Sequence, residues 1–66
     1  MNVKYPNVKV RLSGTDGNAF SIIGKVAQAL RRAGVSAEEQ AAFRKAAMSA
    51  DYDNVLVTAM RWVDVT

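Results

Sequence analysis

The chemistry open to this chain is limited by the residues that it lacks: its 66 residues include no histidine and no cysteine. Imidazole is the usual acid–base group near neutral pH, and the cysteine thiolate is a common nucleophile and metal ligand. Six carboxylates remain, and predicted helix starts account for most of them. The sequence therefore predicts a protein that is not an enzyme and that holds no metal ion and no cofactor.

Three short segments resemble parts of known motifs, and each lacks something that the motif requires. The turn Gly14-Thr15-Asp16-Gly17 precedes a predicted helix, where phosphates bind, but no lysine and Ser/Thr pair follows its last glycine. Asp51-Tyr52-Asp53 opens like a calcium loop, yet the glycine and glutamate of the sixth and twelfth positions are missing. Glu38 and Glu39 are adjacent, so on a helix their carboxylates point in different directions. We interpret the three segments as a turn and two helix starts.

The basic residues are the strongest candidates for a binding site. Nine Lys and Arg against six Asp and Glu give a formal charge of +3. Six of the cations lie in pairs, on one face of a predicted strand and at two helix ends: Lys9, Arg11, Arg31, Arg32, Arg44 and Lys45. If the helix ends lie near the strand, the six would form a patch suited to the phosphate backbone of nucleic acid. The alternative, which we favour, is that the helix-terminal cations complement helix dipoles and the strand face is solvated.

Two segments show the alternation of half-buried strands. In residues 7–13, Val8 and Val10 alternate with Lys9 and Arg11. Residues 62–66 alternate in the same way, and we expect them to pair with residues 8–12. The preceding helix should then end near Arg61.

Three helices are predicted between the strands, each with a suitable N-cap residue: Asn18, Ser36 and Asp51. Ser36 and Glu39 have the spacing of a capping box, and Gly34 is placed to end the first helix in a left-handed conformation. Gly24 lies in the middle of that helix, where glycine is unfavourable. We interpret it as a site where another backbone approaches closely.

The predicted fold class is α+β, a small single domain over residues 1–66 with an N-terminal strand, three helices, and a short C-terminal strand pairing with the first. The predicted core consists of the larger apolar residues on the inward faces: Val8, Val10, Leu12, Phe20, Ile23, Leu30, Phe43, Tyr52, Val55, Leu56, Met60 and Val63. Trp62 is also expected there. So small a domain buries little surface, and a homodimer through the face of Ala42 and Ala46 is one way to bury more.

Five segments resemble a family of short, uncharacterised bacterial proteins: Asn7 to Leu12, Asp16-Gly17-Asn18-Ala19-Phe20, Ala29 to Gly34, Asp51-Tyr52-Asp53 and Met60 to Val63. The family is associated with prophages and other mobile elements. No function is established for it, so the resemblance implies no activity and no site residues.

These observations favour a small non-catalytic protein-interaction module, an adaptor with an unidentified protein partner, because such a module needs only a surface. The alternative is a nucleic-acid-binding accessory protein that uses the basic residues. No apolar run approaches the roughly 20 residues that span a bilayer, and no apolar segment follows the first four residues. We therefore expect a cytoplasmic protein without membrane contact.

Overall fold

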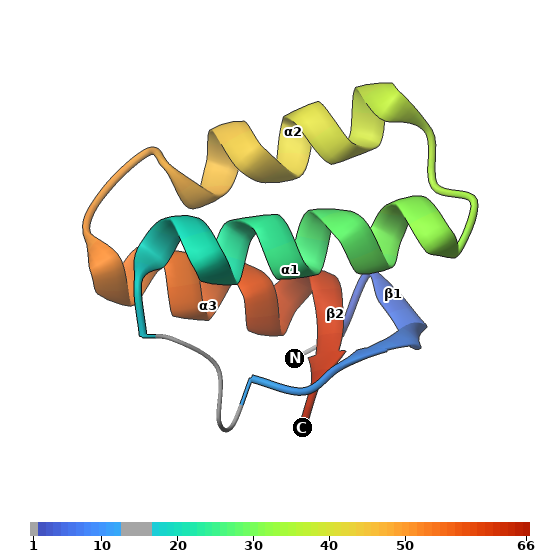
Figure 1. The fold of residues 1–66 in the computed structure, drawn as a ribbon, viewed down its shortest axis with the longest axis horizontal. Coiled ribbons are helices and arrows are strands. Elements are labelled where there is room, and N and C mark those ends of the chain that lie inside the picture. The colour runs from blue at the N-terminus through green and yellow to red at the C-terminus, as the bar shows by residue number, and fades with distance from the viewer. Residues whose placement is uncertain (1, 13–16) are drawn as a thin grey trace.

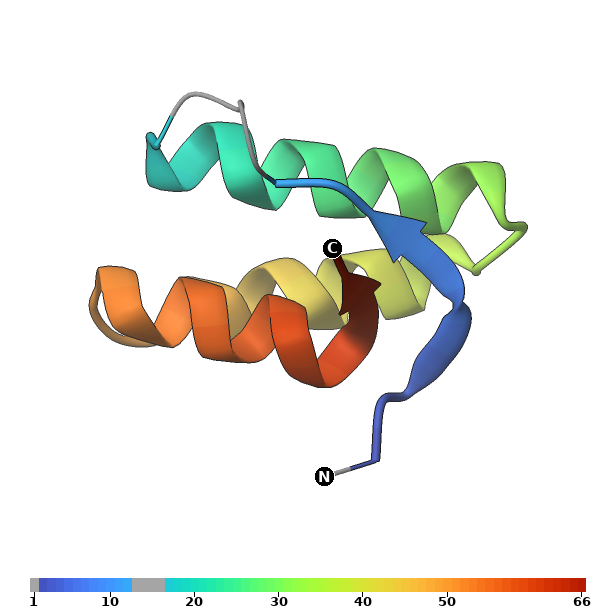
Figure 2. The same cartoon turned by 90° about the horizontal axis from the view of Figure 1, so that it is seen from below.

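The computed structural model describes residues 2–12 and 17–66. Three helices pack alongside one another, and two strands lie beneath the C-terminal half of the first helix (Figures 1 and 2). The element order is β1 (Tyr5–Val10), α1 (Ala19–Arg32), α2 (Ala37–Ala47), α3 (Tyr52–Trp62) and β2 (Val63–Val65). The predicted α+β fold is therefore confirmed. Of the predicted turn over residues 14–17, the first three residues lie outside the described ones.

The strands β1 and β2 form a parallel pair. Lys9 lies opposite Asp64 and Val10 opposite Val65, with an irregularity between Tyr5 and Lys9. Parallel neighbours need a long crossover connection, and the three helices supply it. The helix α3 runs directly into β2, within a residue or two of the predicted boundary.

The core lies between the helices and the inward face of the strands. Its buried members are Val8, Val10, Ile22, Ile23, Val26, Leu30, Phe43, Ala47, Val55, Ala59 and Val63. Three predicted core residues are instead exposed: Phe20 by 76%, Tyr52 by 44% and Met60 by 51%. Phe20 and Tyr52 lie on the same helix faces as the buried Ala27 and Ala59, seven residues later, but in the first turns of α1 and α3, at the edge of the core. Met60 is adjacent to Ala59 and therefore lies on a different face of α3.

The predicted helix junctions are formed by local hydrogen bonds. The side chains of Asn18, Ser36 and Asp51 each accept a bond from a backbone N–H in the first turn of their helix. Gly34 has a φ of +83°. Its N–H donates to the Arg31 carbonyl at 3.1 Å, and the Val35 N–H donates to Leu30 at 3.0 Å, which is the Schellman pattern.

Gly24 does not have the role that the sequence suggested. It is exposed, and a Cβ added to it would meet no atom within 4 Å. The expected close approach of another backbone is wrong, and the glycine only weakens an exposed helix position.

Candidate interaction groove

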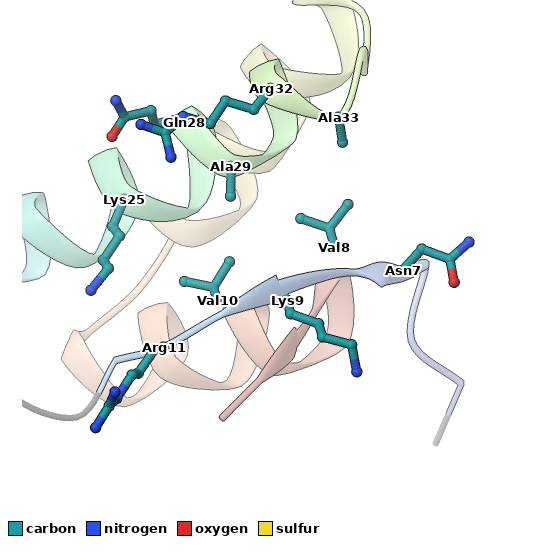
Figure 3. A pocket seen from close by; sticks show the side chains of 10 residues that line it. All are labelled: Asn7, Val8, Lys9, Val10, Arg11, Lys25, Gln28, Ala29, Arg32 and Ala33. Atoms are coloured by element: carbon teal, nitrogen blue, oxygen red, sulfur yellow. The ribbon is translucent and has the colours of Figure 1, made fainter.

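A groove of about 400 Å³ runs between β1 and the second half of α1 (Figure 3). The strand lines it with residues 7–11, and the helix with Lys25, Gln28, Ala29 and Arg32, followed by Ala33. The side chains of Val8 and Val10 point toward α1, whereas those of Lys9 and Arg11 point away from it (Figure 3). The predicted alternation of β1 therefore places the valines inward and the cations outward.

The groove is positively charged. Four of its lining residues are cations, namely Lys9, Arg11, Lys25 and Arg32, and no described lining residue is acidic. Lys9 also contacts Asp64 on β2, with 3.3 Å between Nζ and Oδ2, but the two side chains are 72% and 42% exposed. Water and salt weaken so exposed a pair. The groove thus has the charge that attracts an anionic ligand.

Three of the six predicted basic residues line this groove, and three do not. Lys9, Arg11 and Arg32 line it because the C-terminal half of α1 lies over β1, although the side chains of Lys9 and Arg11 point away from the helix. Arg31, in the last turn of α1, is not among the lining residues, and Arg44 and Lys45 lie in the last turn of α2, also outside the lining. The sequence analysis missed Lys25, although it precedes Arg32 by seven residues, which is two helical turns and hence the same helix face.

The outer edge of β1 is open. Among the described residues the sheet has two strands. Val10 accepts a bond from the Thr66 N–H at 2.9 Å, and the Leu12 N–H donates to Thr66 at 3.3 Å. Successive strand residues direct their backbone groups to opposite edges, so Lys9 and Arg11 direct theirs away from β2. The groove is therefore lined along one side by strand backbone that no described strand pairs with.

The N-terminal half of β1 is tied to the helices instead. The Glu39 carboxylate accepts a hydrogen bond from the Tyr5 hydroxyl at 2.7 Å and forms an ion pair with the Lys4 ammonium at 2.8 Å. Lys4 Nζ also lies 4.2 Å from the centre of the Trp62 ring, which packs against Tyr5 and, edge-on, against Phe43. Trp62 is half-buried, so it covers the core rather than lying within it.

These contacts shift three pKa values. The Lys4 ammonium, followed by the Tyr5 hydroxyl, holds the pKa of the Glu39 carboxyl below its ordinary value. The same bonds to Glu39 raise the pKa of Lys4 and that of Tyr5. Because its carboxylate is engaged with Lys4 and Tyr5, Glu39 contributes only its backbone N–H to the cap at Ser36. Of the predicted capping box, the structure therefore forms the bond from the Glu39 N–H to the Ser36 hydroxyl.

An apolar depression of about 340 Å³ lies elsewhere, where the start of α1 meets the α2–α3 junction. Three of its lining residues are large and exposed, namely Phe20, Met48 and Tyr52. Exposed apolar patches often serve as protein contacts. Phe20 and Tyr52 are two of the residues that the sequence analysis placed in the core.

Among residues 2–12 and 17–66, no three acidic side chains gather where they could hold a metal ion. Within the same residues, no helix combines the length and the apolar character that crossing a membrane requires. The chain matches no known protein-family model, no curated protein and no solved structure. The resemblance to a prophage-associated family stays a prediction.

Proposed function

We propose that this protein is a small non-catalytic protein-interaction module, an adaptor that binds its partner along β1. The observation that carries the proposal is the open outer edge of β1 beside the groove. Extended segments of partner proteins bind such edges through main-chain hydrogen bonds, and neighbouring pockets select their side chains. This function needs no nucleophile, metal ion or cofactor.

The proposal is tested by blocking the edge without removing a bond of the fold. The Lys9 N–H points to the outer edge, so Lys9→Pro removes a donor there and leaves the β1–β2 bonds in place. Lys9→Ala is the matched control, because it removes the same charge and keeps the N–H. In affinity capture from the native host with a high-salt wash, parent and Lys9→Ala should retain the same protein, and Lys9→Pro should lose it. A folded Lys9→Pro variant that retains the protein contradicts the proposal.

A second candidate function is supported by the charge of the groove. Four cations line it, and clustered Lys and Arg are the usual means of binding phosphate backbones. A nucleic-acid-binding accessory protein would use Lys9, Arg11 and Arg32, with Lys25 as a fourth contact. The other predicted contacts, Arg31, Arg44 and Lys45, lie outside the groove lining.

Salt dependence tests this second candidate. On duplex DNA the log–log salt slope is about −0.9 for each phosphate neutralised. Changing Lys9 and Arg11 together to alanine should make that slope shallower by about two units if both contact phosphate. A labelled duplex that fails to bind at low salt and at physiological salt excludes the function. Unchanged binding by the double variant excludes this groove.

Self-association is a separate prediction about the same small domain. Ala42 is exposed on α2, and Ala46 is half-buried. A homodimer through this face should give a mass near twice 7.2 kDa in sedimentation equilibrium at tens of micromolar. A monomer mass at every concentration contradicts it.

A further inference from the structure

We infer that the groove binds an extended acidic segment of a partner protein, which adds to β1 as a third strand beneath α1. This inference rests on the proposed function and specifies the chemistry of the partner. It combines two independent observations, the open backbone edge and the cations that surround it.

The space beside β1 is long enough for a strand. A second depression, of about 450 Å³, continues the groove toward the start of β1 and shares Asn7, Val8 and Ala33 with it. Residues 7–11 alone extend over roughly 16 Å at about 3.3 Å per residue, and an added strand would lie about 4.8 Å from β1. A short extended segment could therefore lie along the edge, where Lys9 offers its backbone N–H and C=O groups.

The cations are spaced for carboxylates on an extended chain. Lys25 and Arg32 are seven residues apart on α1, which is roughly 10.5 Å along the helix axis. Same-face residues of a strand lie about 6.6 Å apart, or about 13.2 Å for every second one, and the spacing of the two cations falls between these values. Lys9 and Arg11 point to the opposite face of β1 and face the remaining positions of the added strand. The groove therefore matches an acidic stretch better than one acidic residue.

Two other occupants fit the groove less well. A second copy of this chain, pairing β1 with β1, would bring Lys9 and Arg11 against their own equivalents, and like charges across strands repel. Single-stranded nucleic acid is held largely by bases stacked on aromatic rings, and none of the ten lining residues described is aromatic. A duplex would meet the cations but would leave the backbone edge unpaired.

The probe is a capped heptapeptide with glutamate at its consecutive central positions and valine at both ends, so that carboxylates face both sides of the added strand. It is titrated into the isotopically labelled protein and followed by NMR. The first control peptide has glutamine in place of glutamate. In the second, alternate backbone nitrogens are methylated, which removes strand donors and keeps every charge. An oligothymidylate of equal charge is the third. We expect the acidic peptide to shift the amides of Lys9, Arg11 and Lys25, the glutamine peptide to bind more weakly at low salt, and the methylated peptide not to bind.

Two pairs of variants sharpen the titration. Lys9→Pro should abolish binding of the acidic peptide, and Lys9→Ala should weaken it by about threefold or less, as for one exposed charge. Lys25→Gln with Arg32→Gln should weaken it about fivefold, whereas Arg31→Gln with Lys45→Gln, which removes the same charge outside the groove, should stay within about twofold.

Three results would overturn the inference. They are no amide shifts at about 1 mM acidic peptide, equal binding of the methylated peptide, and an oligothymidylate that binds as tightly as the peptide and is insensitive to Lys9→Pro. The proposed function is tested separately from the acidic character of the partner. If Lys9→Pro loses the captured protein while acidic peptides do not bind, the adaptor stands and only its acidic partner is wrong.

Discussion

The two halves of β1 are used in different ways. At the N-terminal half, Lys4 pairs with Glu39 at 2.8 Å, Tyr5 bonds the same carboxylate, and both residues pack against Trp62. At the other half, Lys9 makes a longer and more exposed contact with Asp64, and the backbone edge faces a groove. One half thus fastens the strand to the helices, and the other presents charge and a backbone edge with which no described strand pairs.

This difference separates the contacts that stabilise the strand from the proposed binding edge within the eight residues from Lys4 to Arg11. A free strand edge is a liability unless charged residues discourage pairing with other copies of the chain. Lys9 and Arg11 supply that protection, and in the proposed interaction the same charges would select an anionic partner. The edge can remain open because the contacts of Tyr5, Lys4 and Trp62 hold β1 in place.

The largest expected effect comes from breaking the fastened half. Trp62→Ala removes the ring that packs against Phe43, Tyr5 and Lys4, and should lower the free energy of unfolding by about 2–3 kcal/mol, less than for a fully buried tryptophan. Arg32→Ala at the groove should change it by less than about 0.5 kcal/mol. Urea denaturation measures both. Equal losses in the two variants would show that the halves do not differ in their contribution to stability.

A second prediction concerns the junction that ends the groove near Gly34. Gly34→Ala forces a non-glycine residue to a φ of +83° and should destabilise by about 1 kcal/mol or more. Ser36→Ala should also cost about 1 kcal/mol through the lost cap. Gly24→Ala is the matched control, since it adds the same methyl in open space and should stabilise by about 0.5–1 kcal/mol. Urea melts in which the two glycine variants shift in the same direction would contradict this assignment.

The fastened half should also respond to pH, with a smaller effect because its groups are partly exposed. The pKa of Glu39 is lowered in the folded state from an ordinary value of 4.5. Its contribution is therefore complete above that pH and is lost as the pH falls through the folded-state pKa. Thermal melts between pH 2 and about 6 should show a shallower acid-side loss for Glu39→Gln than for the parent. Glu38→Gln is the control, and an identical change in both variants would argue against the Lys4–Glu39 pair.

The smallest effect is expected at the open half. Lys9→Ala and Asp64→Asn should each change the free energy of unfolding by less than about 0.5 kcal/mol, because the ion pair is exposed. Denaturation at low and at high salt checks this, and the difference between variant and parent should vanish at high salt. A loss above about 1 kcal/mol in either variant would mean that this half also holds the fold.

Local patterns were sufficient to predict the helix starts and the Gly34 ending, because a cap depends on residues within a few positions of one another. The hydrogen bond between Tyr5 and Glu39 was not predictable in this way, since the two residues are 34 positions apart. Likewise, Asn54 donates to the carbonyls of Ala46 and Ala47 at 2.9 and 3.1 Å, across a junction that leaves no sequence pattern. Half of the predicted cationic patch lines the groove because α1 crosses β1, and the position of α2 depends on packing between helices.

The central claim, an open edge on a fastened strand, is tested most directly by amide hydrogen exchange at Lys9. In the free protein we predict fast exchange at Lys9 and protection at Lys4, whose N–H donates to the Arg61 carbonyl at 2.9 Å. Adding the captured partner should slow exchange at Lys9 and leave Lys4 unchanged. A Lys9 amide protected as strongly as that of Lys4 in the free protein would contradict the account.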